Sequence, residues 1–139
     1  MKQQFISFLA IFILINSFSC TKEKIFQNEG IIGKWQLTEV YDGYANGGSF
    51  SWNKVSKEYS HSLKFSANGE YSRIENSGNG GQECSGTYVL DAANNLDIKT
   101  NCQTLTEVMK ISELTNSNLI IDRQAIEGII RYKYKAVKN

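Results

Sequence analysis

Apolar and polar residues alternate along most of the chain after residue 30, the pattern of strands that bury one face of a sheet. Short stretches rich in Gly, Asn, Asp and Ser separate the alternating segments, and the chain contains no proline that would interrupt a strand ladder. No window shows a helical period. The pattern predicts eight strands, at residues 31–41, 61–65, 71–75, 84–90, 96–101, 104–114, 117–122 and 128–137.

The second and third predicted strands form a hairpin. Asn68-Gly69 between them is a strong turn signal, because glycine tolerates the left-handed backbone that a tight hairpin requires. A three-residue loop with Gly69 in the left-handed region would pair Phe65 with Tyr71. Leu63 and Phe65 would then point to one side of the sheet.

A second hairpin places two of the three cysteines opposite each other. When it is centred on Ala93, Leu90 lies opposite Leu96, and continuing the same register brings Cys84 opposite Cys102. Opposed residues on neighbouring strands can lie within disulfide range. A bond would close a loop of about 19 residues and add roughly 3 kcal/mol of stability. The alternatives are a pair of metal ligands or a redox couple, although the chain has no Cys-x-x-Cys motif and only one histidine.

Residues 42–59 do not follow the strand pattern. They are rich in Gly, Asn and Ser and yet carry Tyr44, Phe50 and Trp52. A loop of this length in a compact domain is usually functional or disordered. The aromatic residues suit either a lid over an apolar cavity or a plug at one end of the core.

The N-terminus is predicted to carry an export signal. Residues 5–18 are almost wholly apolar, and about 14 residues is too short for a bilayer-spanning helix, which needs roughly 20. A short apolar run after one positive residue is typical of a secretory signal. An uncleaved anchor helix or a buried core helix is the alternative. We therefore predict a signal at residues 1–19, a polar tether at 20–30 and a folded domain at 31–137.

Cys20 stands directly after this signal. Ser17-Phe18-Ser19-Cys20 resembles a bacterial lipobox, with Ser17 in place of the usual Leu or Val. The resemblance implies cleavage before Cys20 and a lipid on its thiol. Each buried methylene contributes about 0.8 kcal/mol, so two or more acyl chains would hold the domain on a membrane. We expect a bacterial envelope protein anchored to a membrane, such as the outer membrane on its periplasmic or surface side. Ordinary cleavage nearby would instead leave Cys20 as a free thiol.

Charge and residue content exclude several functions. The chain has 15 basic and 14 acidic residues, and loss of Lys2 with the signal leaves 15 − 1 = 14 against 14. A neutral domain lacks the basic surface that nucleic acid requires. Because no nucleophile, base and orienting group form a recognisable motif, we expect no enzyme, no catalytic residue, no metal and no cofactor.

Several segments resemble one family. The strings IIGKWQLTEVY, LKFSANGEYSRI, SGTYVLD, MKISELTNSNLIID and IIRYKYKAV are similar, in order and spacing, to lipocalins and to the bacterial lipocalin-like domain family. The resemblance covers about residues 30–137. It implies an all-β fold, a closed, eight-stranded, antiparallel up-and-down barrel with an apolar interior.

The resemblance also implies a structural plug. In lipocalins the tryptophan of the Gly-x-Trp motif closes one end of the barrel beneath an arginine of the last strand. Gly33 and Trp35 match the motif, and Arg131 is the candidate arginine. Simple alternation, however, places Arg131 on the opposite face from Tyr132 and Tyr134.

Two charged residues fall on faces that the pattern predicts to be apolar. Glu39 shares a face with Trp35 and Leu37, and Arg73 shares a face with Tyr71. Buried charges need partners. We expect Glu39 and Arg73 to pair with each other, to bind a polar group of a ligand, or to lie in a wet barrel mouth.

The sequence is compatible with two functions. The first is a lipid-anchored binding protein for a small apolar molecule, with residues around the cavity at Glu39, Tyr41, Phe65, Tyr71 and Arg73. The second is a structural or protein-interaction module of the envelope, whose protein partner is unknown. A small eight-stranded barrel can be filled by its own side chains, and large residues on the predicted inner faces favour a filled one.

Overall fold

A computed structural model describes residues 29–44, 47–76 and 81–138 of the chain. The predicted signal, the lipobox with Cys20 and most of the tether lie outside these residues. Within them, no helix is long and apolar enough to cross a membrane.

Among the described residues, all eight predicted strands are present, together with one short 3₁₀ helix and one additional strand. The additional strand, β2, lies inside the stretch that the sequence presented as a loop. The elements, in chain order, are η1 (Glu29–Ile31), β1 (Gly33–Tyr44), β2 (Trp52–Lys54), β3 (His61–Phe65), β4 (Glu70–Glu75), β5 (Glu83–Leu90), β6 (Asn95–Thr100), β7 (Glu107–Leu114), β8 (Asn118–Ala125) and β9 (Gly128–Ala136).

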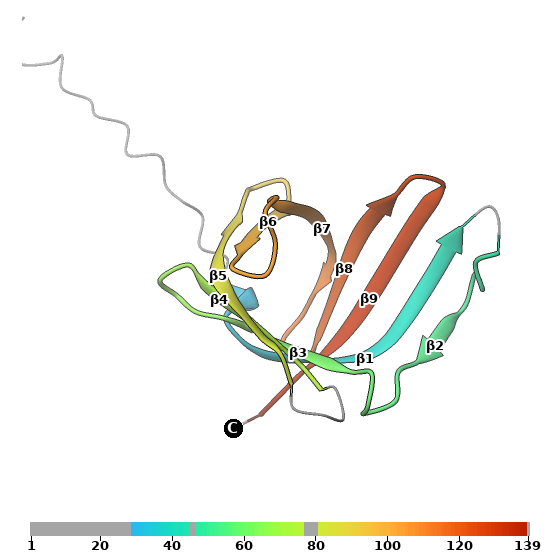
Figure 1. Cartoon of the computed structure of the whole chain (residues 1–139), viewed down its shortest axis with the longest axis horizontal. Helices are drawn as coiled ribbons and strands as arrows, with labels where there is room; N and C mark the ends of the chain where they lie inside the picture. The colour runs from blue at the N-terminus through green and yellow to red at the C-terminus, as the bar shows by residue number, and fades with distance from the viewer. Residues whose placement is uncertain (1–28, 45–46, 77–80, 139) are drawn as a thin grey trace, which may run out of the picture.

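The strands form a closed antiparallel barrel (Figure 1). From β3 to β9 each strand pairs with the next along the chain, and β1 pairs with β9 to close the ring. β1 is long enough to have two partners on its other edge: Gly33–Gln36 pair with β3, and Glu39–Tyr41 pair with β2. The barrel therefore has eight strands, and β2 extends its wall beside the second half of β1.

A β-bulge in β1 reverses the faces that simple alternation predicts. Leu37 pairs with Tyr134 of β9, but the next paired residue is Glu39, so Thr38 is the extra residue. One inserted residue moves every later side chain to the other side of the sheet. Val40 consequently packs against the core, while Glu39 and Tyr41 lie on the outer face. The expectation that Glu39 and Tyr41 point inward is wrong for this reason.

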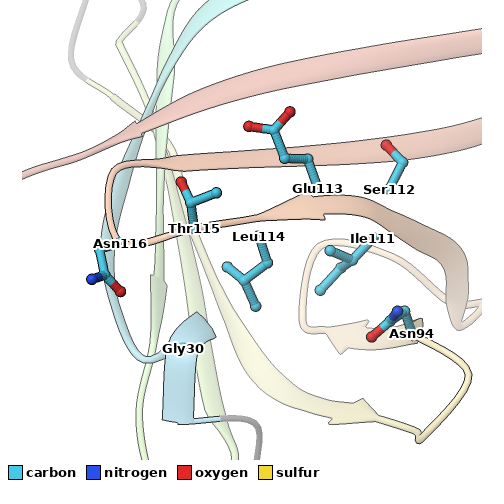
Figure 2. A pocket seen from close by; sticks show the side chains of 8 residues that line it. All are labelled: Gly30, Asn94, Ile111, Ser112, Glu113, Leu114, Thr115 and Asn116. Atoms are coloured by element: carbon cyan, nitrogen blue, oxygen red, sulfur yellow. The ribbon is translucent and has the colours of Figure 1, made fainter.

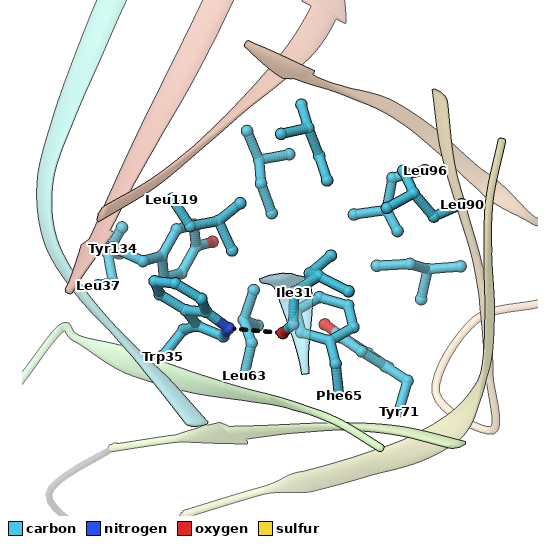
Figure 3. Close-up of a cluster of buried hydrophobic side chains, with 13 residues drawn as sticks. Ile31, Trp35, Leu37, Leu63, Phe65, Tyr71, Leu90, Leu96, Leu119 and Tyr134 are labelled. Carbon is cyan, nitrogen blue, oxygen red and sulfur yellow. Dashed lines mark hydrogen bonds between the residues drawn. The ribbon is translucent and has the colours of Figure 1, made fainter. Parts of the chain in front are cut away.

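One end of the barrel is closed by apolar side chains around η1 (Figure 3). Trp35 is buried there, and its indole Nε1 donates a hydrogen bond to the carbonyl oxygen of Ile31 at 2.8 Å. Arg131 lies on the outer face against Tyr41, so the arginine contact implied by the family resemblance does not form. The most deeply buried side chains are those of Ile31, Phe65, Leu96, Leu119 and Ile121. We call this the plugged end and the opposite end the open end.

Both predicted hairpin registers are observed. Phe65 pairs with Tyr71, and Gly69 has a φ of 84°, as the turn between them requires. In the second hairpin Leu90 pairs with Leu96. A disulfide links Cys84 to Cys102, with Cα atoms 5.5 Å apart.

The aromatic residues after β1 neither cover a cavity nor fill the core. Phe50 is 59% exposed, and Trp52 packs against Tyr41 on the outer face, with ring centroids 5.7 Å apart. Both expectations for this segment, a lid and a plug, are therefore wrong for Phe50 and Trp52.

Candidate binding site

A small cavity of about 70 Å³ lies inside the open half of the barrel. Strands β3, β4, β7, β8 and β9 supply its lining, and each contributes residues that point inward. Leu63, Met109 and Ile121 form an apolar part of its wall. The polar part consists of His61, Tyr71, Arg73, Glu107, Arg123, Tyr132 and Tyr134. The cavity is thus a polar chamber beside an otherwise apolar core.

Arg73 is the least satisfied group of this chamber. Its Nη2 donates to Oε1 of Glu75 at 2.7 Å, and the two side chains are 33% and 46% exposed. Its Nε is buried and has no hydrogen-bond partner among the described residues. A buried donor without a partner costs about 1–3 kcal/mol. Arg73 therefore presents a positive charge at the cavity, while its Nε is shielded from the cavity space.

A second ion pair lies across the lining. Arg123 Nε is 3.7 Å from Oε1 of Glu107, which is long for a hydrogen bond. A hydrogen bond with Tyr132 raises the pKa of Arg123, so its guanidinium is charged at neutral pH. The two arginines, Arg73 and Arg123, each have a carboxylate partner, Glu75 and Glu107, and these four charges sum to zero.

His61 is neutral in this chamber. Burial, followed by the positive charge of Arg73, lowers the pKa of His61 from 6.5 to about 4. Its Nε2 lies 3.0 Å from the hydroxyl of Tyr134, and the two rings meet edge to face. Burial also raises the pKa of Tyr134 and of Tyr71. At neutral pH the chamber therefore contains uncharged imidazole and phenol groups between the two ion pairs.

The structure separates the five residues predicted to surround a ligand. Tyr71 and Arg73 line the chamber, and Phe65 lies deeper in the core, where its ring meets that of Tyr71 at 5.3 Å between centroids. Glu39 and Tyr41 lie outside the barrel. Glu39 and Arg73 do not pair with each other, because Glu39 binds Lys133 and Arg73 binds Glu75.

Glu39 and Tyr41 belong instead to an outer cluster, formed with Trp52, Arg131 and Lys133. Lys133 Nζ is 2.6 Å from Oε2 of Glu39 and 4.7 Å from the centroid of the Trp52 ring. The guanidinium of Arg131 lies 5.6 Å from the centroid of the Tyr41 ring. These contacts hold β2 and β9 against β1.

The sequence contained a signal for the lining residues that the prediction omitted. In the predicted strand 104–114, alternation places Glu107 on the same face as the buried Ile111. Arg123 follows the predicted strand 117–122 directly, and the same alternation places it on the face of the buried Ile121. Arg73 was predicted to be a site residue because its charge falls on an apolar face. The same criterion identifies Glu107 and Arg123.

A larger hollow of about 290 Å³ lies near η1 at the plugged end (Figure 2). Ile111 and Leu114 point toward Gly30 and Asn94, whereas Ser112 and Glu113 point to the other side of β7. Its lining contains one charged residue, Glu113, and that side chain points to the other side of β7. The chamber at the open end is the better candidate.

Comparison with known proteins identifies the fold family. A family model described as a lipocalin-like domain matches residues 31–121, which is more than half of the chain. The chain belongs to the lipocalin-like domain family. This assignment confirms the predicted all-β barrel.

A solved structure shares this lipocalin-like fold. A lipocalin-like protein from Bacteroides uniformis ATCC 8492 is 20% identical, with a TM-score of 0.59, over 78% of this chain and 99% of that one. The siderocalin Ex-FABP, described as having dual ligand specificities, is 12% identical, with a TM-score of 0.48, over 79% of this chain and 76% of that one. Curated protein sequences give no match.

The chamber of this lipocalin-like domain contains groups that can bind a polar molecule. In the described part of the chain, no three His, Cys, Asp or Glu residues gather as metal ligands. The histidine of the chamber contacts a tyrosine hydroxyl rather than an activated nucleophile. Two guanidinium groups and several phenols can instead bind and orient a polar group.

Proposed function

We propose that this lipocalin-like domain binds a small molecule at the open end of its barrel. The observation that carries the proposal is the chamber itself, which brings the charged side chains of Arg73 and Arg123 together with three tyrosines. Ligand sites are concave and contain a few polar groups that fix the orientation of the ligand. A ligand with a polar group would find such groups in this chamber.

The ligand of this proposal differs from the apolar molecule expected from the family resemblance. Buried apolar side chains, among them Phe65 and Leu119, fill the plugged half of the interior. The chamber of about 70 Å³ is far smaller than the roughly 300–1,000 Å³ of typical small-molecule sites. We therefore propose that only a small polar portion of the ligand enters it.

Native mass spectrometry of the purified domain tests the proposal. We expect a stoichiometric adduct, or its formation on adding members of a small-molecule library, together with a higher melting temperature. Met109→Trp, which enlarges a lining residue, should remove the adduct. Val108→Trp is the matched control, because Val108 is the preceding residue of β7 and points outward. Equal adducts in both variants would show that the ligand binds elsewhere.

A filled structural or protein-interaction module is the second candidate function. The small volume of the chamber favours it, since a small barrel can be occupied by its own side chains. In that case neither an adduct nor a thermal shift should appear with any library member. The partner would then be sought by crosslinking on the outer face.

We further propose that the domain is anchored to the bacterial envelope by a lipid on Cys20. The lipobox-like Ser17–Cys20 stretch and the short apolar run before it support this proposal. Cys20→Ser should move the protein from the membrane fraction to the soluble fraction. Unchanged partition would instead make the apolar run itself the anchor.

A further inference from the structure

We infer that the outer wall of the barrel formed by β1, β3 and β4 docks on an anionic membrane surface. A groove of about 400 Å³ on this wall is lined by Lys34, Lys64, Ser62, Ser72, Ile74 and Val137. We call it the basic groove, because both of its charged residues are lysines. The inference rests on the proposed anchor at Cys20, and it adds the face that the anchored domain turns toward the lipid.

The two lysines of the basic groove form a pair of like charges. Lys34 of β1 lies directly opposite Lys64 of β3. Both residues are exposed, and neither has an ion pair among the described residues. Like charges directly opposite each other on neighbouring strands destabilise a sheet. An anion that contacts both lysines would remove this repulsion.

Elsewhere in the barrel, opposed charges are complementary. The other lysine, arginine and acidic residues that lie opposite one another across the described strands combine opposite signs: Glu39 with Lys54 and Lys133, and Asp122 with Lys110 and Arg131. The like-charge pair is therefore a local exception, and its surplus positive charge fits an anionic partner.

The apolar border of the groove identifies that partner as a lipid surface. Ile74 is 37% exposed and Val137 is 38% exposed. Amphipathic surfaces that lie on membranes place apolar side chains at the boundary between headgroups and acyl chains, while their lysines attract anionic lipids. Ser72, opposite Lys64, adds a hydroxyl that can donate to a phosphate oxygen. A soluble anion would use the lysines and the hydroxyl but not the apolar border.

The tether enters the fold beside the basic groove. η1 ends at Ile31, and Gly33, two residues later, also lines the groove. Glu29 is nine positions after Cys20 (29 − 20), so a lipid on Cys20 lies at most about 30 Å from Glu29. The anchor therefore keeps the groove within reach of the membrane, and docking becomes an intramolecular event.

The lysines select the orientation of the anchored domain rather than attach it. Each lysine near an anionic surface favours contact about fivefold, so two lysines favour it roughly 30-fold. This preference is too weak to hold a free domain on a membrane, but it is enough to select one face of an anchored one. Because the chain after the signal has 14 basic and 14 acidic residues, only a face with a local surplus of lysine can make this choice.

Lysine acetylation on vesicles tests the inference. The closed barrel lies wholly within residues 33–136, so the chain from Cys20 onward keeps the fold. Cys84 and Cys102 form a disulfide, so Cys20 is the free thiol that couples to a maleimide-bearing lipid. The vesicles contain phosphatidylcholine alone or phosphatidylcholine mixed with phosphatidylglycerol. Mass spectrometry then measures the acetylation rate of each lysine.

The groove lysines should respond to the charge of the vesicle. Lys34 and Lys64 should be acetylated at least about fivefold more slowly on the anionic vesicles, because headgroups cover them. Lys99 and Lys110 are exposed on β6 and β7, which lie across the ring from β1 and β3, and they should react at equal rates on both vesicles. High salt should abolish the difference, since it screens the attraction.

A double variant removes the charge of the groove. Lys138, an exposed residue directly after Val137, is the reporter and should also be acetylated more slowly on anionic vesicles. In Lys34→Gln combined with Lys64→Gln, Lys138 should react as fast as on neutral vesicles. Lys99→Gln combined with Lys110→Gln is the matched control, and Lys138 should stay slow in it.

Each other outcome overturns the inference. Equal rates for the groove lysines and for Lys99 and Lys110 in the unmodified chain would mean that no face is preferred, even if a variant fails to fold. Equal slowing on neutral vesicles would exclude the lysines as the reason for docking. Slowing by inorganic phosphate without vesicles would make a soluble anion the partner. If Cys20→Ser leaves the partition in cells unchanged, the proposed anchor fails, while the coupled chain still decides whether the groove faces lipid.

Discussion

The two ends of the barrel are stabilised by different interactions. At the plugged end, Ile31, Leu96 and Leu119 are almost fully buried, and the indole of Trp35 hydrogen-bonds to the backbone. At the open end, two partly exposed ion pairs and a buried histidine line the barrel, and a disulfide lies at the level of Arg73 because Cys84 pairs with that residue. Apolar packing holds one end, while polar contacts and a covalent bond hold the other.

This difference shows how a small barrel can be stable and still contain polar groups in its interior. Apolar burial contributes about 25 cal/mol per Å², so the plugged end can stabilise the whole ring. Polar groups at the open end carry a desolvation cost and contribute less to stability. The open end can therefore contain groups, such as Arg73, that do not raise the stability of the fold.

Truncation at the plugged end should have the largest effect. Leu119→Ala removes a side chain that is fully buried, and we expect unfolding free energy to fall by about 2–5 kcal/mol. Urea denaturation measures the change. Val108→Ala, on an exposed side chain, is the control and should stay within about 0.5 kcal/mol. Equal losses in the two variants would contradict the assignment of the core.

Loss of the disulfide should have the next largest effect, at the open end. Cys84→Ser combined with Cys102→Ser should lower unfolding free energy by about 3 kcal/mol, because the bond joins residues 18 apart in the sequence. Urea denaturation with and without reductant measures this loss. The reductant should destabilise the unmodified domain and leave the double variant unchanged. Insensitivity of the unmodified domain would mean that the bond is absent.

His61 should make the open end sensitive to acid. In the unfolded chain His61 gains a proton as the pH falls through about 6.5. In the folded domain, burial and the charge of Arg73 lower the pKa of His61 to about 4, so it gains the proton only near that pH. Between these values protons favour the unfolded chain, so stability should fall by roughly 2–3 kcal/mol from pH 6.5 to pH 4. His61→Gln should reduce this slope in urea titrations at several pH values. An unchanged slope would assign the acid sensitivity to carboxyl groups.

The smallest effect is expected in the outer cluster. Lys133→Met removes the ion pair with Glu39 and the contact with the Trp52 ring. Partly exposed pairs and cation–π contacts contribute only about 0.5–1 kcal/mol each. The loss should therefore stay near 1 kcal/mol in urea denaturation. A loss as large as that of Leu119→Ala would mean that β2 supports the core.

The sequence predicted the fold better than the site, for identifiable reasons. Alternation and turn residues located the strands and the Phe65–Tyr71 register because both are local signals. The bulge at Thr38 has no glycine or other marker, so alternation from Trp35 reversed the faces of Glu39 and Tyr41. β2 was missed because its three residues lie within a polar, glycine-rich stretch.

The chamber itself depends on distant strands. Arg73 was found because its charge interrupts a local apolar pattern, and Glu107 and Arg123 could have been found in the same way. Their ion pairs depend on which strands face one another across the barrel. No local pattern specifies such a contact.

The seam between β1 and β9 has a consequence for the time course of synthesis. Tyr134 is synthesised 97 residues after its partner Leu37 (134 − 37), so at about 5–20 residues per second one edge of β1 waits roughly 5–20 s for its partner. An unpaired edge is a template for association with other chains. The ring can therefore close only after nearly the whole domain has been synthesised, because β9 is the last strand of the chain described.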